Sequence, residues 1–394
     1  MSVKRILHVV GCMDRGGIET WLMHILRNSD RQNFQMDFLV ETTKKSAYDD
    51  EIVAFGSKII PCLHPSKPLL YASNFKKIYR EHGPYDIIHS HIHNYSGYVL
   101  RLAKQVGVPL RIAHSHNNTS AIDAKVGLTR RLYLGLTKYW IKKYATVGLS
   151  CSSTAAAALY GSEWKKDSRW QLLYYGIDLC AFNVESASTT KRSQFGIPED
   201  ALIIGHVGRF DMQKNHDFLI DIAVEVIKRE PKAYFLLIGD GLLRSTIEKK
   251  VQQLRLSQQI IFAKLRSDVP QLMKTVMDVF LLPSLHEGLP LVLLEAQAAG
   301  LTCVFSDTIT EEVNIVKVLM QQLSLSQPPE KWAEIILTAS YAKSQITPKE
   351  SLSLVKQSPF NIHTSVQELQ NIYTKSSANY KQTINFTIPP RINT

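Results

Sequence analysis

Short apolar runs alternate with longer stretches of helical periodicity along most of the 394-residue chain. Apolar runs of about four to eight residues between turn residues are typical of buried strands. The pattern predicts strands in the first half of the chain at 5–10, 36–41, 85–90, 110–115, 146–151 and 171–176. It predicts strands in the second half at 202–209, 233–241, 259–264, 278–284 and 302–307. Strands that alternate with helices indicate an α/β fold whose parallel sheets are covered on both faces.

The chain is too long for one ordinary core, because a domain takes roughly 150 residues. We therefore expect two Rossmann-like, doubly wound parallel-sheet domains, 1–182 and 183–375, that face each other across a central cleft. The polar stretch 183–200 is the predicted linker region. The last predicted helix, at about 361–375, is expected to pack back on the first domain, and 376–394 is expected to be a polar tail.

Neither end of the chain carries an apolar run that is long enough to span a bilayer. The first ten residues have two basic positions and then a short apolar run, which favours a strand over a signal peptide. The five cysteines are widely spaced and form no CxxC motif, which favours a reducing compartment and no structural zinc. These features predict a cytoplasmic protein.

Basic residues gather in the first half of the chain. Residues 1–180 hold 24 of the 46 lysines and arginines but only 14 of the 35 acidic residues, so this half carries nearly all of the net charge of +11. The stretch 129–145 interleaves cations with leucines and aromatic residues, as a helix on the inner face of an anionic membrane does. A helix packed on its own sheet with solvated cations is the equal alternative. A nucleic-acid partner is not expected, because the chain has neither an RNP-type motif nor a zinc finger.

Ligands of doubly wound sheets bind at the carboxyl ends of the strands, so the loops that follow strands are the places to seek chemistry. Gly16 and Gly17 follow the first strand and precede a helix, where backbone N–H groups are free to meet a phosphate. Gly239 and Asp240 form a similar turn in the second half. Taken alone, the first of these turns is better explained as a plain tight turn, and ordinary turn chemistry explains the second adequately.

The segment 207–218 follows the first strand of the second half. Arg209 and Lys214 lie in this loop, directly before a helix. A guanidinium and an ammonium at such a position are suited to hold a diphosphate.

The segment HEGLPLVLLEAQAAG, residues 286–300, places Glu287 and Glu295 eight positions apart. Pro290 suits the start of a helix and Gly300 its end, so the predicted helix runs from about 290 to 299. Its other residues are apolar on every side, so Glu295 is predicted to be a buried carboxylate that awaits hydrogen-bond donors. A glycosidase-type pair is disfavoured, because eight helical residues span about 12 Å, whereas such pairs lie roughly 5 to 9.5 Å apart.

Taken together, these motifs resemble the retaining glycosyltransferases of family 4, which have the GT-B fold. The resemblance rests on EGLPLVLLE at 287–295, GRFDMQKN at 208–215, IGDG at 238–241 and the glycine pair at 16–17, and it extends over nearly the whole chain. The segments RIAHSHN, SDTITEEVNI and PEKWAE also resemble bacterial members that build capsular polysaccharide or exopolysaccharide.

The resemblance implies a role for each candidate. Glu295 would accept hydrogen bonds from the ribose, and Glu287 would contact hydroxyls of the donor sugar. Arg209 and Lys214 would neutralise the leaving diphosphate, so no metal and no other cofactor is expected. Further donor contacts would come from Gly16, Gly17, Gly239, Asp240, Gly288, Leu289 and Pro290.

Histidines are concentrated near two predicted strand ends. His89, His91 and His93 alternate after one strand and His114 and His116 after another, so each group shares a face. A metal site is the alternative interpretation, but no acidic residue or cysteine joins the group. The family places one histidine near the donor sugar, and we favour His116 over His114 for that position. His91 and His114 are then candidates for the sugar or acceptor side.

The predicted activity is therefore the retaining, metal-independent transfer of a sugar from a nucleotide-sugar donor to a growing glycan, lipid-linked and of capsular or exopolysaccharide type. UDP is favoured over GDP as the nucleotide, although Ala263 stands where the family's backbone often meets the base and leaves the base open. The alternative on the same fold is a nucleotide-sugar epimerase or hydrolase.

Overall fold

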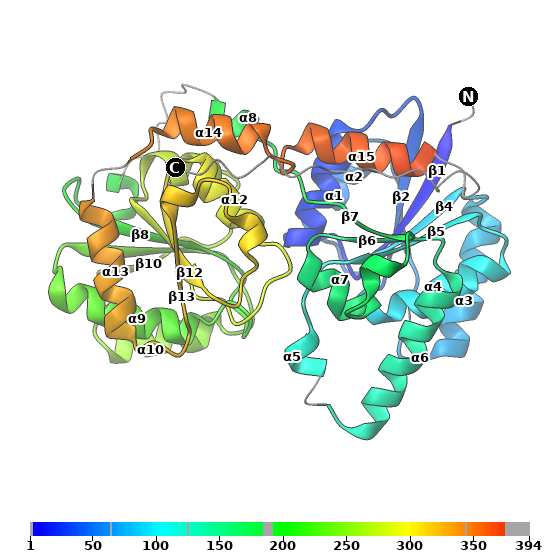
Figure 1. Ribbon diagram of the computed structural model, residues 1–394, viewed down its shortest axis with the longest axis horizontal. Coiled ribbons are helices and arrows are strands. Elements are labelled where there is room, and N and C mark those ends of the chain that lie inside the picture. Colours follow the sequence, from blue (N-terminus) through cyan, green and yellow to red (C-terminus); the bar gives the residue numbers. More distant parts are fainter. Residues whose placement is uncertain (1–2, 64, 124–125, 184–191, 343–344, 375–394) are drawn as a thin grey trace.

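The computed structural model describes residues 3–63, 65–123, 126–183, 192–342 and 345–374 (Figure 1). Two separate parallel sheets organise these residues, one in each half of the chain. The predicted linker lies partly, and the predicted tail at 376–394 entirely, outside the described residues.

The first sheet has seven parallel strands in the order β3-β2-β1-β4-β5-β6-β7. The strands are β1 Lys4–Val9, β2 Phe34–Val40, β3 Ile59–Pro61, β4 Ile87–Ser90, β5 Leu110–Ser115, β6 Val147–Ser150 and β7 Trp170–Leu172. The helices of this half are α1 Gly17–Asn28, α2 Asp49–Ala54, α3 Pro68–His82, α4 Ser96–Gln105, α5 Ser120–Asp123, α6 Leu128–Tyr144, α7 Ser153–Tyr160 and α8 Cys180–Asn183. The order reverses at β1 and β4, and ligand sites of such sheets lie at this reversal.

The second sheet has six parallel strands in the order β10-β9-β8-β11-β12-β13. The strands are β8 Leu202–Val207, β9 Ala233–Ile238, β10 Ile260–Phe262, β11 Val279–Leu282, β12 Thr302–Ser306 and β13 Met320–Leu323. The helices that follow are α9 His216–Arg229, α10 Arg244–Gln253, α11 Val269–Thr275, α12 Leu291–Ala298, α13 Pro329–Tyr341, α14 Pro348–Gln357 and α15 Ile362–Thr374. Here the order reverses at β8 and β11, so the loops after these two strands converge.

The last helix returns to the first half of the chain. Figure 1 shows α15, in red, beside α1. The Trp21 indole donates a hydrogen bond to Ser365 Oγ at 3.4 Å, and Ser365 Oγ donates one to the Tyr174 carbonyl at 2.9 Å. A side-chain carbon on Gly176 would lie 2.3 Å from Ile362 Cα, so this glycine admits the close approach of the entering helix.

The structure and the predictions agree on an α/β fold with two Rossmann-like parallel sheets. The sequence pattern missed the two edge strands β3 and β13. β3 has three residues and ends in a proline, and β13 carries two exposed glutamines, so neither shows an apolar run. In the described part of the chain, no helix has the length and apolar character needed to cross a membrane.

Candidate active site

The loop between β11 and α12 holds Glu287 against the loop after β8. Lys214 Nζ forms an ion pair with Glu287 Oε1 at 2.6 Å, and Gln213 Nε2 donates to Glu287 Oε2 at 2.9 Å. Glu287 is only 6% exposed, so its charge requires these two partners. Each carboxylate oxygen still has a lone pair for a ligand hydroxyl. Two predicted site residues, Lys214 and Glu287, are thus brought together directly.

Glu295 lies at the middle of α12, which begins at Leu291 and ends at Ala298, close to the predicted limits. Most side chains of this helix are buried, whereas Glu295 is half-buried. Among the described residues, none donates a hydrogen bond to the Glu295 carboxylate and none forms an ion pair with it. Desolvation by burial raises the pKa of Glu295 to about 7. Its carboxylate therefore remains available for the donors of a ligand.

The two halves of the chain meet at Gly16 and Arg209. Gly16 is the N-cap of α1, without a side-chain cap, and Arg209 is an exposed residue of the loop after β8. A side-chain carbon on Gly16 would lie 2.7 Å from Arg209 Nη2 and 2.3 Å from Glu19 Oε2. Gly17 opens α1 and has open space beside it. The guanidinium of Arg209 has no ion-pair or hydrogen-bond partner in the part of the chain that the structure describes.

Two further contacts join the same edges of the two sheets. A side-chain carbon on Gly288 would lie 1.9 Å from the His116 carbonyl oxygen, so the β11–α12 loop touches the backbone after β5. The Ser153 backbone N–H at the start of α7 donates to Glu312 Oε1 at 3.0 Å. Leu289 and Pro290 are buried, and Pro290 is the N-cap of α12. The loops at the carboxyl edges of the sheets therefore face and contact each other.

The turn after β9 is hydrogen-bonded to the loop after β8 and packs closely against it. Gly239 has a φ of +146°, and a side-chain carbon there would lie 1.9 Å from the Gly208 carbonyl oxygen. The Asp240 carbonyl accepts a hydrogen bond from the Phe210 N–H at 2.9 Å, and Asp240 Oδ1 accepts one from the Gly241 N–H at 2.8 Å. Gly239 and Asp240 thus support the loop that carries Arg209.

Five buried histidines form two hydrogen-bonded chains on one face of the first sheet. In the first chain, His116 Nε2 meets His91 Nδ1 at 2.8 Å, and His91 Nε2 meets His8 Nδ1 at 3.0 Å. In the second, His114 Nδ1 meets His89 Nε2 at 3.0 Å, and His89 Nδ1 meets the Tyr373 hydroxyl at 2.8 Å. His93 does not join these chains, because it lies in a short 3-10 turn after β4, 3.4 Å from Thr119 Oγ1.

Burial favours the neutral form of each of these five imidazoles. Desolvation lowers the pKa of His8 and of His114 to about 3. It also lowers the pKa of His89, His91 and His116 well below the ordinary value, and neighbouring histidines add to the effect.

The histidine cluster offers nitrogens at metal-ligand spacing. Within each of two triplets the nitrogens lie within 4.8 Å of one another: His8, His89 and His91, and His91, His114 and His116. The hydrogen bonds between the rings already occupy most of these nitrogens. Among the residues that the structure describes, none makes a hydrogen bond to the buried atoms His8 Nε2, His114 Nε2 and His116 Nδ1. Both ring nitrogens of His89 and of His91 form hydrogen bonds, whereas His116 Nδ1 forms none with the described residues. The His116 carbonyl also lies against the Gly288 loop, so a ligand contact suits His116 better than His89 or His91.

Sequence reasoning missed four residues that shape this site. Gln213 holds Glu287, Glu19 lies against Gly16, and His8 and Tyr373 end the histidine chains. Glu19 lies two residues after the glycine pair, in GGIE, so the sequence could have indicated it as a neighbour of this motif. The other three depend on contacts between distant segments.

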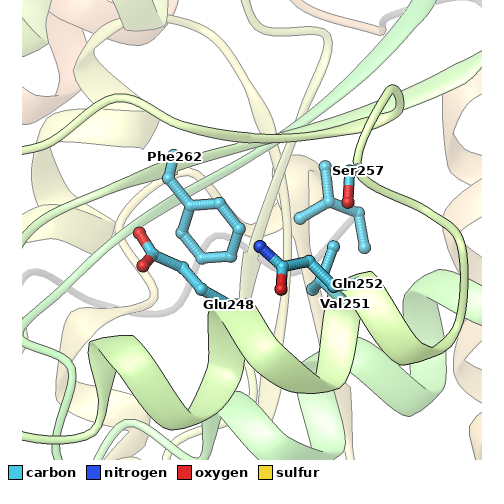
Figure 2. Close-up of a pocket in the computed structure, with 6 residues that line it drawn as sticks. Glu248, Val251, Gln252, Ser257 and Phe262 are labelled. Atoms are coloured by element: carbon cyan, nitrogen blue, oxygen red, sulfur yellow. The ribbon is translucent and has the colours of Figure 1, made fainter.

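A separate pocket lies between α10 and β10 (Figure 2). Its lining residues are Glu248, Val251, Gln252, Ser257, Ile260 and Phe262. None of these is a predicted site residue, and Glu248 is paired with Arg244 at 2.8 Å.

Comparisons with known proteins agree with this architecture. A family model described as glycosyl transferases group 1 matches residues 187–340, and one for glycosyltransferase family 4 matches residues 15–180. EpsF of Bacillus subtilis (strain 168), which carries the provisional name of a glycosyltransferase, is 38% identical over 95% of this chain and 98% of its own length. CapH of Staphylococcus aureus, a capsular polysaccharide biosynthesis glycosyltransferase, is 25% identical over 94% of this chain and 98% of its own.

Two other matches name a donor or an acceptor. An Escherichia coli galactosyltransferase, named for UDP-Gal and α-D-GlcNAc-diphosphoundecaprenol, is 29% identical over 57% of this chain and 58% of its own. The crystal structure of HepE from Anabaena with UDP and glucose superposes with a TM-score of 0.78 at 19% identity and covers 93% of this chain and 98% of that protein.

Proposed function

The chain belongs to the glycosyltransferases of group 1 and family 4, and we propose that it moves a sugar from a UDP-sugar to a lipid-linked glycan with retention of configuration. As a glycosyltransferase it is related to enzymes of capsular polysaccharide biosynthesis. The observation that carries the finer proposal is the convergence of Arg209, Gly16 and the Lys214–Glu287 pair at the facing edges of the two sheets.

The positive groups that converge at the facing edges of the two sheets are suited to stabilise a diphosphate leaving group. The sugar–phosphate bond breaks as negative charge grows on the diphosphate, so fixed positive groups lower the barrier. The unpartnered guanidinium of Arg209 supplies one such group and Lys214 a second. The N–H groups at the start of α1 supply a third from the other half of the chain. With these charges in place, we propose that the transfer needs no metal.

The two carboxylates are assigned to different parts of the donor. Glu287, fixed by Lys214 and Gln213, has lone pairs for the sugar hydroxyls. Glu295, which has no hydrogen-bond partner among the described residues, accepts hydrogen bonds from the two ribose hydroxyls. UDP as the nucleotide is supported by the HepE complex with UDP and glucose and by the UDP-Gal in the name of the galactosyltransferase.

His116 is proposed to meet the donor sugar from the first sheet. Its carbonyl touches the Gly288 loop and its Nδ1 lacks a partner. Because the imidazole is neutral, it can donate to or accept from a hydroxyl without adding charge beside the diphosphate. His91 then acts as a positioning residue through its hydrogen bond to His116.

The lipid-linked acceptor is supported by the outer face of α6. Four apolar side chains of this helix are exposed: Leu128, Leu132, Leu136 and Tyr139. They fall on one stripe, and Lys142 and Lys143 are exposed beside it. Trp140, in contrast, is half-buried against Tyr98, and Lys138 donates to the Ala158 carbonyl. The proposed membrane contact therefore uses leucines and one tyrosine, and neither Trp140 nor Lys138.

Turnover with and without acceptor tests the proposed reaction. The protein is incubated with UDP-hexoses, alone and with undecaprenyl-diphosphate-linked sugars in vesicles, and UDP release is followed. We expect release that depends on acceptor, and a new glycosidic bond with the donor's anomeric configuration by NMR. Full-rate release from donor alone would instead establish the hydrolase or epimerase alternative.

A further inference from the structure

Glu19 occupies the place where the donor diphosphate is proposed to bind. It lies in the first turn of α1, three residues after the N-cap Gly16. Its Oε2 would lie 2.3 Å, and its Cδ 3.2 Å, from a side-chain carbon built on Gly16. The side chain therefore folds back over the start of its own helix, on the side that also meets Arg209.

The carboxylate of Glu19 uses the same groups that a phosphate would use. The carboxylate lies in the first turn of α1, beside N–H groups that lack a carbonyl partner, and its own backbone N–H lowers the pKa of Glu19. Desolvation raises the pKa of Glu19, and the positive charge of nearby Arg209 opposes this rise. An N-terminal turn favours one anion at a time, because two like charges at one end repel each other.

Glu19 and Arg209 both lie close to the N-cap glycine of α1. A single added carbon on Gly16 would collide with Glu19 on one side and with Arg209 Nη2 on the other. A phosphate oxygen that approaches α1 on this side of Gly16, between Arg209 and the helix start, would therefore meet the Glu19 carboxylate. Its side chain is only half-buried, so it has space to rotate away.

We infer that Glu19 is an internal anion that competes with the donor diphosphate for Arg209 and the start of α1. Without ligand its negative charge lies near these cationic groups without an ion pair to Arg209, and the diphosphate displaces it on binding. After transfer, when UDP carries the added charge of the broken bond, the return of Glu19 promotes release of UDP. This inference rests on the proposed diphosphate site, and it adds a residue that sets its affinity and its rate of release.

The test compares wild-type protein with Glu19→Gln. Calorimetry and stopped-flow measure the binding of UDP and of uridine, which has no diphosphate. We expect UDP to bind on the order of tenfold more tightly to Glu19→Gln and to dissociate more slowly, because a like charge has been removed from the site. Uridine affinity should stay the same. Asp50→Asn is the matched control, since Asp50 is an exposed acid of the same half of the chain and forms an ion pair with Lys45.

The other outcomes are distinguishable. Unchanged or weaker UDP binding by Glu19→Gln, with wild-type binding intact, would overturn the inference and leave the proposed function standing. A lower thermal midpoint of Glu19→Gln without any change in UDP binding would mean that Glu19 acts only as a helix cap, and this result would also overturn the inference. Tighter UDP binding by Asp50→Asn as well would mean a general charge effect, against the inference. Absence of UDP binding in the wild type would overturn the proposed function and the inference together.

Discussion

Glu295 combines a half-buried position with the absence of any partner among the described residues. A carboxylate is placed there at a cost in free energy, which a ligand with two hydroxyl donors offsets. The sequence predicted this carboxylate because one charge interrupts an apolar helix. It did not predict the pairing of Glu287 with Lys214, because the two residues lie 73 positions apart and only the strand order brings their loops together.

The raised pKa of Glu295 gives a pH test. The ionised carboxylate is the better acceptor for ribose hydroxyls, so binding should favour the deprotonated form. With a pKa of about 7 before binding, uridine affinity should rise about tenfold from pH 6 to pH 8. Uridine is the suitable probe because it does not ionise in this range. Titration calorimetry should show a flat profile for Glu295→Gln, and a flat profile in the wild type would contradict the role.

The buried histidines predict sensitivity to acid. Their folded pKa lies below the unfolded value of about 6.5, so the unfolded state takes up protons first as the pH falls. Stability is therefore complete above pH 6.5 and declines below it, toward the folded pKa of about 3 for His8 and His114. Each such histidine costs up to about 1.4 kcal/mol per pH unit.

Thermal unfolding between pH 7.5 and pH 5 measures this effect. The midpoint should fall steeply in the wild type, and the fall should be shallower in His8→Gln, which has one titrating group fewer. The exposed His363, replaced by Gln, is the control and should keep the wild-type slope. Equal slopes for all three proteins would refute the assignment of acid sensitivity to the buried cluster.

At the scale of elements, the helix α6 carries the proposed membrane contact. Replacing Leu132 and Leu136 with Ser removes two exposed apolar side chains from its outer stripe. Full burial of a leucine is worth about 1.5 to 3 kcal/mol, so partial insertion of two should weaken binding to anionic vesicles at least tenfold. Vesicle sedimentation measures this, with Leu354→Ser on the outer side of α14 as control.

The basic side chains of α6 should act separately from its leucines. Charge reversal at Lys142 and Lys143 removes an attraction of about 1 kcal/mol per lysine near the surface. The loss should shrink as salt rises, whereas the loss from the leucine variant should persist. If neither variant lowers sedimentation, α6 is an ordinary solvated face.

Element prediction succeeded where apolar runs are long and failed at two of the edge strands, β3 and β13. The strands that form each sheet's interior are buried nearly throughout, and their runs predicted them. The edge strand β13 has two exposed glutamines between half-buried Met320 and Leu323, so its pairing with β12 left no apolar run or alternation to read. The histidine alternation predicted shared faces for β4 and β5. It could not place His8 beside them, because β1 and β4 are neighbours in the sheet but distant in the chain. Their paired residues Leu7 and Ile88 are 81 positions apart, with β2 and β3 between them in the sequence.

At the scale of the whole molecule, the two halves meet through backbone at Gly288. Gly288→Ala would place a carbon 1.9 Å from the His116 carbonyl oxygen and 3.0 Å from Asn117 Cα, and backbone atoms cannot move aside as a side-chain tip can. We expect the facing loops to separate, with a larger radius of gyration in solution scattering and weaker UDP-sugar binding. Gly11→Ala, where the added carbon meets nothing, is the matched control. An unchanged radius together with unchanged affinity would contradict this contact.

Chain length and strand pattern predicted two halves that face each other, but they could not predict the contacts between the halves. Apolar periodicity predicts the strands of each sheet, but it carries no information about contacts between loops that are far apart in the chain. The contacts of Gly16 with Arg209 and of Ser153 with Glu312 are of this kind. The domain limits 1–182 and 183–375 stay predictions, since the linker between them lies partly outside the described residues.

The division of labour between Glu287 and Glu295 is the centre of the account, and ligand-induced thermal stabilisation tests it most directly. Ligand at 100 times its dissociation constant adds about 2.7 kcal/mol to the stability of the wild type. Glu295→Ala should lose stabilisation by both UDP and a UDP-sugar. Glu287→Gln should keep stabilisation by UDP and lose only the increment that the sugar adds. The same response to UDP and to UDP-sugar in both variants would contradict the two separate contacts.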